Sequence, residues 1–227
     1  MKQITWKNFA LLTGLCVGCT GAAAASELDF EGIGAGLYVR RDDMTIENST
    51  TRFDVQADRF GFLLSENVRP WLSLGLLGGI AAVDTEGQAM TDGMQLSGSY
   101  VGVYLSGMAF DEPRWRIAYR ASVFYQSTED KVDSQRVELD WLESGVSVTA
   151  GFNISTMVSV YVGPHYRNLD VDQRASGTVN ATARFSEDDS LDAVVGVVLE
   201  VDPGGYVDLA AHRGASDGFT LTFRRQY

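Results

Sequence analysis

The sequence is poor in histidine, cysteine, lysine and proline. Among 227 residues there are two histidines, two cysteines, four prolines and three lysines. Both cysteines, Cys16 and Cys19, lie near the start of the chain, in a segment that we expect to be removed. A mature chain without them forms no disulfide. We accordingly predict no catalytic residues, no cofactor and no metal ion.

Positive charge is also scarce. The chain has 30 acidic residues against 18 basic ones, which argues against a nucleic-acid partner because such proteins present a basic face. Without the first 25 residues, which include Lys2 and Lys7, the balance is 16 minus 30, or −14. Lys131 is then the only lysine, beside 15 arginines. Arginine outcompetes lysine where a cation must fork onto carboxylates, although a genomic bias would give the same count.

The start of the chain has the features of a secretory signal peptide. Lys2 and Lys7 precede a short apolar run over 9–18, and four alanines follow at 22–25. We predict a signal peptide at 1–25 and a mature domain at 26–227. A lipoprotein is the rival, but neither cysteine has Leu three residues before it. No later stretch has 18 consecutive apolar residues, so no transmembrane helix is expected.

What recurs after residue 25 is alternation of apolar and polar residues with a period of two, which predicts β-strands. The clearest case is 114–126, where Trp115, Ile117 and Tyr119 share one face and Arg116 and Arg120 share the other. The same pattern predicts ten strands, at 28–41, 51–65, 70–83, 94–110, 114–127, 136–153, 157–170, 181–201, 205–213 and 218–227. Eight strands remain an alternative. The alternation changes phase within 136–153, which a bulge at 143–145 would explain.

The connections between these strands alternate in length. Short turns contain or adjoin Pro70, Pro113 and Pro203, whereas 42–50, 84–93, 128–135 and 171–190 are longer and acidic. Outer-membrane barrels alternate in this way. We expect 171–190 to be a loop from which 178–188 can be removed. Aromatic residues near strand ends predict interfacial girdles: Trp71, Tyr104, Phe110, Trp115, Tyr125, Trp141, Tyr161, Tyr166 and Tyr206.

The end of the chain carries a resemblance to a known family. Phe219, Leu221, Phe223 and Tyr227 lie on one face of the last predicted strand. An alternating last strand with an aromatic final residue resembles the terminal signal of bacterial outer-membrane β-barrels, although Arg225 departs from that pattern. The resemblance implies an all-β, antiparallel, up-and-down transmembrane barrel in a Gram-negative outer membrane. It implies the barrel assembly machinery, outer-membrane lipid and lipopolysaccharide as partners. An even strand count places both termini in the periplasm.

Polar residues on the faces assigned to the lumen form the candidate site. We predict a lumen network of Arg116, Arg120, Asp54, Asp58, Glu138, His165, Arg167, Asp208 and His212. Arg116 and Arg120 should pair with carboxylates of neighbouring strands, because an unpaired buried charge is costly.

Three functions are compatible with these predictions. The first is a non-enzymatic outer-membrane barrel with a structural, surface-interaction or narrow-pore role. The second is a lumenal enzyme that acts on lipid or peptide. The third is a soluble periplasmic, lipocalin-like binder with apolar residues inside, which periodicity alone does not distinguish from a membrane barrel.

Overall fold

The computed structural model describes residues 32–88, 91 and 94–227. The expected signal peptide and residues 28–31 of the first expected strand lie outside the described residues. None of the residues described belongs to a helix that is long and apolar enough to cross a membrane.

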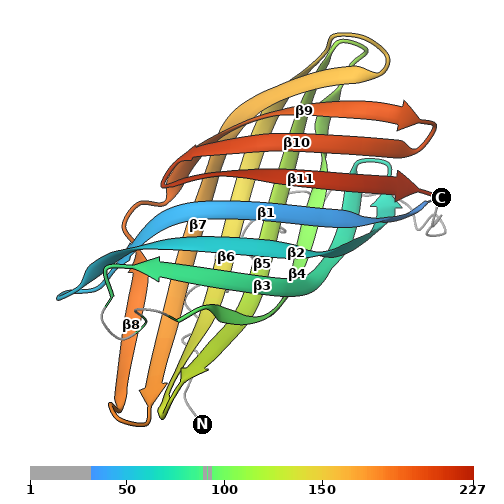
Figure 1. Cartoon of the computed structure of the whole chain (residues 1–227). Coiled ribbons are helices and arrows are strands. Elements are labelled where there is room, and N and C mark those ends of the chain that lie inside the picture. The colour runs from blue at the N-terminus through green and yellow to red at the C-terminus, as the bar shows by residue number, and fades with distance from the viewer. Residues whose placement is uncertain (1–31, 89–90, 92–93) are drawn as a thin grey trace, which may run out of the picture.

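The described chain is built almost wholly of antiparallel strands (Figure 1). They are β1 (Ile33–Glu47), β2 (Arg52–Arg69), β3 (Leu72–Glu86), β4 (Leu96–Asp111), β5 (Trp115–Val132), β6 (Gln135–Asn153), β7 (Val158–Ser176), β8 (Ala181–Glu187), β9 (Leu191–Asp202), β10 (Gly205–Gly214) and β11 (Ser216–Gln226). Most strands run beyond the predicted bounds into segments predicted as loops.

Ten of these strands close into a ring. Successive strands pair from β1 to β7, then β7 pairs with β9, and β9, β10 and β11 lead back to β1. The closing ladder runs from Gly34 opposite Gln226 to Met44 opposite Ser216. The ten-stranded, up-and-down antiparallel barrel predicted from the sequence is therefore confirmed. We call the end where Gly34 meets Gln226 the base. The opposite end, which carries β8 and is drawn at the lower left of Figure 1, we call the top.

The ring narrows toward the top because β7 changes its partner. Its first part, Val158 to Tyr166, pairs with β9, and its later part, Asp170 to Ala175, pairs with β8. In turn, β8 joins β1 through two residue pairs, Ile46 with Glu187 and Glu47 with Ser186. The top is thus an eight-stranded ring, β1 to β8, above a ten-stranded base.

This arrangement corrects two predictions. The strand predicted at 181–201 is two strands, and most of the supposed loop 178–188 is β8. Phe185 of β8 is 2% exposed and belongs to the interior of the top, so the segment is not a free loop.

The side of the barrel wall that is apolar also differs between the two ends: it is the outer side near the base and the inner side near the top. On β2, Phe60, Phe62 and Leu64 are exposed on the outer face near the base. Asp54 and Asp58 occupy the same outer face nearer the top, while Phe53 and Val55 point inward and are buried.

The phase change in β6 has the same origin. Its register with β5 is unbroken from Trp115 opposite Phe152 to Val132 opposite Gln135, so the predicted bulge at 143–145 is absent from this ladder. Leu139 and Trp141 point inward, whereas Val146 and Val148 point outward. The strand passes from an apolar exterior to an apolar interior without any break.

The outer face around the base half is the apolar belt that a barrel needs in hydrocarbon. Its aromatic members include Trp71, Phe110, Trp115, Tyr125 and Tyr166, each exposed. Four residues assigned to the girdles, Tyr104, Trp141, Tyr161 and Tyr206, instead occupy inward positions of their strands. Alternation predicts that two residues share a face, but it does not say which face is outside.

The topology predicts opposite outcomes for two changes of similar length. Replacing 181–187 by a Gly-Ser linker should leave the ten-stranded ring intact, so the protein still inserts and keeps its heat-modifiable gel mobility. Deleting 219–227 removes the closing ladder and leaves two rows of backbone groups without partners, each costing several kcal/mol in lipid. That deletion should abolish insertion.

Membrane fractionation, gel mobility and limited proteolysis measure both outcomes. The β8 replacement should become sensitive to protease only in the top half, at the β5–β6 and β7–β8 hairpins. Retained insertion of the 219–227 deletion would show that β11 does not close the barrel.

Candidate functional site: the lumen

The structure places six of the nine predicted network residues on the lumen side. They are Arg116, Arg120, His165, Arg167, Asp208 and His212. The other three, Asp54, Asp58 and Glu138, lie on the outer face of the top half and form part of a charged exterior. The prediction assumed that each strand has one apolar outer face along its whole length. In fact the apolar face of a strand is on the outside near the base and on the inside near the top, so charges near the top point outward.

The exterior of the top is covered by cross-strand pairs rather than by isolated charges. Asp58 accepts two hydrogen bonds from Arg41, at 2.6 and 2.7 Å, and Asp54 accepts one from Thr45 at 2.7 Å. Glu138 lies 3.5 Å from Arg174. These groups are solvated, and exposed pairs of this kind add little stability.

A buried group of charges crosses the lumen at the height where the ring narrows. We call it the ionic layer: Arg40, Asp42, Arg59, Glu143, Arg167 and Glu187. Arg40 Nε lies 2.7 Å from Asp42 Oδ2, and Arg40 Nη1 lies 3.1 Å from Glu143 Oε1. Arg59 Nη1 lies 2.9 Å from the second oxygen of Glu143. One carboxylate therefore bridges two guanidinium groups that come from neighbouring strands.

Arg167 joins β8 to this layer. Its Nε and Nη2 donate three hydrogen bonds to the Glu187 carboxylate, and its Nη1 lies 3.8 Å from Asp42 Oδ1. Burial raises the pKa of the Glu187 carboxyl above its ordinary value, although the Arg167 hydrogen bond opposes the shift. The strand that narrows the ring is thus attached through a buried ion pair.

The ionic layer is buried and neutral. Its side chains are at most 6% exposed, and its three cations face three anions. Several polar atoms of the layer, including Arg40 Nη2 and Asp42 Oδ1, make no hydrogen bond within the described residues. Burial of a charge is tolerated only when its partner stays in place, so removal of one member is expected to be costly.

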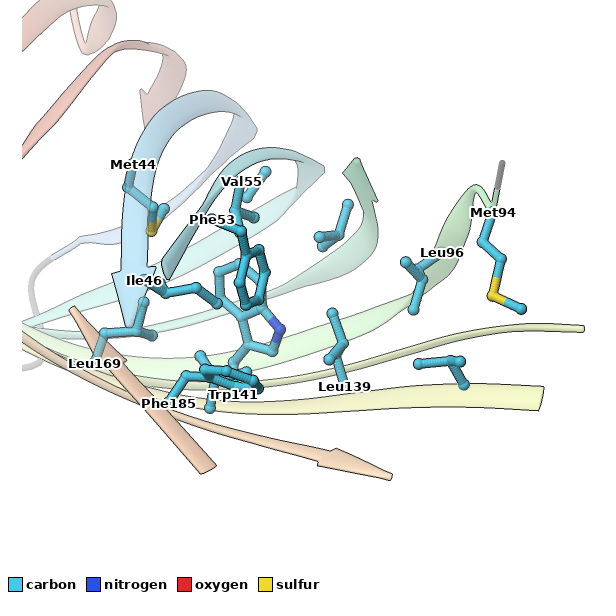
Figure 2. Packing of buried hydrophobic residues seen from close by; sticks show 14 of the residues in the cluster. Met44, Ile46, Phe53, Val55, Met94, Leu96, Leu139, Trp141, Leu169 and Phe185 are labelled. Carbon is cyan, nitrogen blue, oxygen red and sulfur yellow. The ribbon is translucent and has the colours of Figure 1, made fainter. Parts of the chain in front are cut away.

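Above the ionic layer the lumen is filled by apolar side chains (Figure 2). We call this group the top core: Met44, Ile46, Phe53, Val55, Ala57, Val83, Met94, Leu96, Val137, Leu139, Trp141, Leu169, Val171, Ala175 and Phe185. The rings of Phe53 and Phe185 meet edge to face at 5.0 Å, which joins β2 to β8. An eight-stranded ring is just wide enough for side chains to fill it.

The histidines lie beside the ionic layer. His165 Nδ1 is 3.6 Å from Asp192 Oδ2, and the two imidazole rings are 6.1 Å apart. Ser216 gives its backbone N–H and its hydroxyl to the same Asp192, at 2.7 and 3.3 Å, and His212 contacts Thr220. The Ser216 hydroxyl is therefore directed to the carboxylate and not to an imidazole. Within the described residues no group of three or more possible metal ligands occurs.

Arg116 and Arg120 do not find the carboxylate partners that we expected. The Arg116 guanidinium donates to Asn153 and Ser159, and the Arg120 guanidinium lies over the Tyr104 ring at 4.4 Å. Asp208 accepts a hydrogen bond from Tyr161 at 2.8 Å. Neutral polar groups and an aromatic ring of the wider base half contact these two side chains instead.

Sequence reasoning missed most of the ionic layer. Only Arg167 was assigned to the lumen, whereas Arg40, Asp42, Arg59 and Glu143 were not singled out. A signal was present, because each of these charges shares its inward parity with apolar residues nearer the top, such as Met44 and Ile46. Glu187 could not be recognised in this way, because its segment was divided between a loop and a strand.

Comparison with known proteins gives structural likeness only. No protein-family model matches the chain, and no curated protein matches it. The similar solved structures include the outer membrane protease OmpT from Escherichia coli, at 10% identity, 90% and 96% coverage of this chain and that chain, and a TM-score of 0.46. Another is the translocator domain of the autotransporter NalP from Neisseria meningitidis, at 9% identity, 97% and 94% coverage of this chain and that chain, and a TM-score of 0.47. A third is the attachment invasion locus protein Ail of Yersinia pestis, at 12% identity, 86% and 96% coverage, and a TM-score of 0.39. At these values the likeness transfers no residue role or activity.

The ionic layer predicts a large effect for one conservative substitution. Glu143→Gln keeps the shape of the side chain but leaves Arg40 and Arg59 without the charge that they share. Breaking a buried pair from one side costs about 3–5 kcal/mol. Denaturant unfolding of the detergent-solubilised barrel should show this loss. The matched control is Asp58→Asn, which breaks the exposed pair with Arg41 and should hardly move the midpoint. Equal shifts for the two variants would contradict the assigned role of the layer.

Proposed function

We propose that this chain is an integral outer-membrane barrel that neither conducts nor catalyses and that holds a rigid, charged extension above the membrane as a contact surface. In this proposal the base, where the described chain begins and ends, faces the periplasm, and so do both termini. The observation that supports it most is the double closure of the lumen, first by the ionic layer and then by the top core. A narrow pore would need a continuous hydrated path through both.

The exterior supports insertion of the base half in a bilayer. A closed ring leaves no unpaired strand edge in hydrocarbon, and the apolar belt faces the lipid. Outer-membrane lipid and lipopolysaccharide would surround that belt. The lipid-facing residues Phe219, Leu221 and Phe223 of β11 would be available to the barrel assembly machinery before closure. A soluble lipocalin-like protein would instead carry polar residues around its base.

The tip of the top half supports the contact role, because its two hairpins are fastened to each other. Ser134 and Thr178 bond through their hydroxyls at 2.9 Å. The Gln135 side chain donates to the Val179 carbonyl at 3.1 Å and accepts from the Val179 N–H at 2.9 Å. Val179 is 50% exposed at this point, beside the charged outer face. A preorganised tip loses less conformational entropy on binding than mobile loops do.

The proposal excludes lumenal hydrolysis on geometric grounds. A triad needs a nucleophile that bonds to the base and a space for the substrate carbonyl. His165 meets Asp192, but the nearby Ser216 hydroxyl is bonded to that carboxylate, and Asp192 is buried. His165→Ala should therefore change no hydrolytic activity of purified protein on lipid or peptide substrates.

The double closure predicts little or no ion conductance. Purified protein in planar bilayers should give no steady open level, because the buried ionic layer and the top core leave no hydrated path. The linker replacement of 181–187 loosens both closures and is the matched positive variant, so it should admit transient openings. A steady open channel of porin size in the unaltered protein would refute the non-conducting role.

The proposed orientation predicts which end of the barrel a surface reagent reaches. Thr178→Cys at the tip and Ser155→Cys in a base turn are matched single-cysteine variants, provided that Cys16 and Cys19 are removed with the signal peptide. A membrane-impermeant maleimide added to intact cells should label Thr178→Cys only, and both variants should react after the outer membrane is permeabilised. Labelling of Ser155→Cys alone in intact cells would reverse the orientation, and a soluble species would contradict the membrane location.

A further inference from the structure

The base half of the lumen differs from the top half in how far its side chains are buried. Inward residues of the top, such as Val137 and Leu139, are 0% exposed, whereas Arg116, Arg120 and Arg224 are only half-buried. The difference follows from ring size. Ten strands enclose a wider bore than eight, and side chains do not fill it to the same degree.

Glycines keep aromatic rings against the wall of this base half. A Cβ atom added to Gly75 would overlap the ring of Tyr104, and one added to Gly196 would overlap the ring of Tyr161. Each ring therefore occupies the space directly above a glycine on a neighbouring strand. Rings placed in this way line the wall rather than cross the bore.

Three arginines of the base half form no ion pair within the part of the chain that the structure describes. Arg120 lies over Tyr104 at 4.4 Å, and Arg224 lies over Tyr206 at 5.5 Å. Within the part of the chain that the structure describes, neither of these guanidinium groups donates a hydrogen bond or forms an ion pair. Arg116 donates only to Asn153 and Ser159. A ring that covers one face of a guanidinium leaves its N–H edge free to fork onto an oxyanion.

The base half differs from the ionic layer in how its charges are paired rather than in their number. The ionic layer holds equal numbers of cations and anions. The base half has these three arginines and three inward carboxylates, Asp208, Glu200 and Asp111, of which Asp111 lies opposite Arg116 in the β4–β5 ladder. Asp208 is engaged by the Tyr161 hydroxyl, and it lies within electrostatic reach of both Arg120 and Arg224. Arg120 and Arg224 nevertheless keep guanidinium edges that no carboxylate occupies within the described residues.

We propose that Arg116, Arg120 and Arg224 form a binding site, open at the base, for a ligand that carries phosphate or carboxylate groups. The guanidinium groups supply forked donors, and Tyr104 and Tyr206 hold two of them against the wall. The ionic layer closes the site from above, so the ligand enters and leaves through the base. The site does not depend on the orientation of the barrel or on its role as a contact surface.

The test measures anion binding by calorimetry on the purified barrel in non-ionic detergent at low salt. Inorganic phosphate and citrate serve as separate probes for the phosphate and carboxylate sources. Arg120→Gln and Arg224→Gln should each weaken binding by about tenfold, which corresponds to about 1.4 kcal/mol. Asp208→Asn removes a competing carboxylate and should strengthen binding. Added sodium chloride should weaken it by screening.

Arg213→Gln is the matched control, because Arg213 is an exposed arginine on the outer face of β10. Its affinity should equal that of the unaltered protein, and unchanged heat-modifiable mobility should show that every variant is folded. Binding of phosphate alone assigns a phosphate ligand, binding of citrate alone assigns a carboxylate ligand, and binding of both supports the shared chemistry. Binding of neither probe, or equal weakening by Arg213→Gln, would overturn the proposal.

Discussion

The architecture depends on the ionic layer, because this is where the two halves of the barrel join. The backbone N–H of Arg167 donates to the Ser190 carbonyl at 2.8 Å, between the part of β7 that pairs with β9 and the part that pairs with β8. The Arg167 side chain binds Glu187 at the same height. Narrowing the ring and neutralising the buried charges are therefore accomplished by the same residues. A barrel of ten full-length strands would leave the top too wide for its apolar side chains to meet.

The preference for arginine over lysine has a structural cause in this chain. Arg41 donates hydrogen bonds to both carboxylate oxygens of Asp58, and Arg184 donates to both carboxylate oxygens of Asp172, at 3.0 and 3.3 Å. In the interior, Arg40 reaches two different carboxylates through separate nitrogens. A lysine ammonium is a single compact centre and could not span such pairs in the same way. The geometry supports the forked-pairing explanation for the composition, both on the outer face of the top and inside it.

Local pattern was enough to predict the strands, since alternation is a property of each segment alone, whereas the closed ring was implied by the resemblance of the last strand to outer-membrane barrels. It was not enough for features that depend on what surrounds a segment. The pairing of β7 first with β9 and then with β8 joins residues that alternation does not connect, so alternation alone predicts a single strand at 181–201. The charges Asp54 and Glu138 were placed in the lumen because one strand was assumed to meet one environment. Arg116 and Arg120 were placed correctly, but their partners depend on the width of the bore.

With the base half in a bilayer, as proposed, the inversion of the apolar face also fixes how deeply the protein sits in it. On β2 the outer face changes from a carboxylate at Asp58 to an aromatic ring at Phe60, and on β6 it changes from Asp140 to Leu142. If the barrel sank by one residue pair, carboxylates would enter hydrocarbon, and if it rose by as much, apolar side chains would meet water. A bilayer of a different thickness would then have to deform around the protein, because the protein could not slide to match it. A mismatch in lipid thickness would therefore exert its force on the barrel at one level, where the outer face changes from carboxylates to apolar side chains.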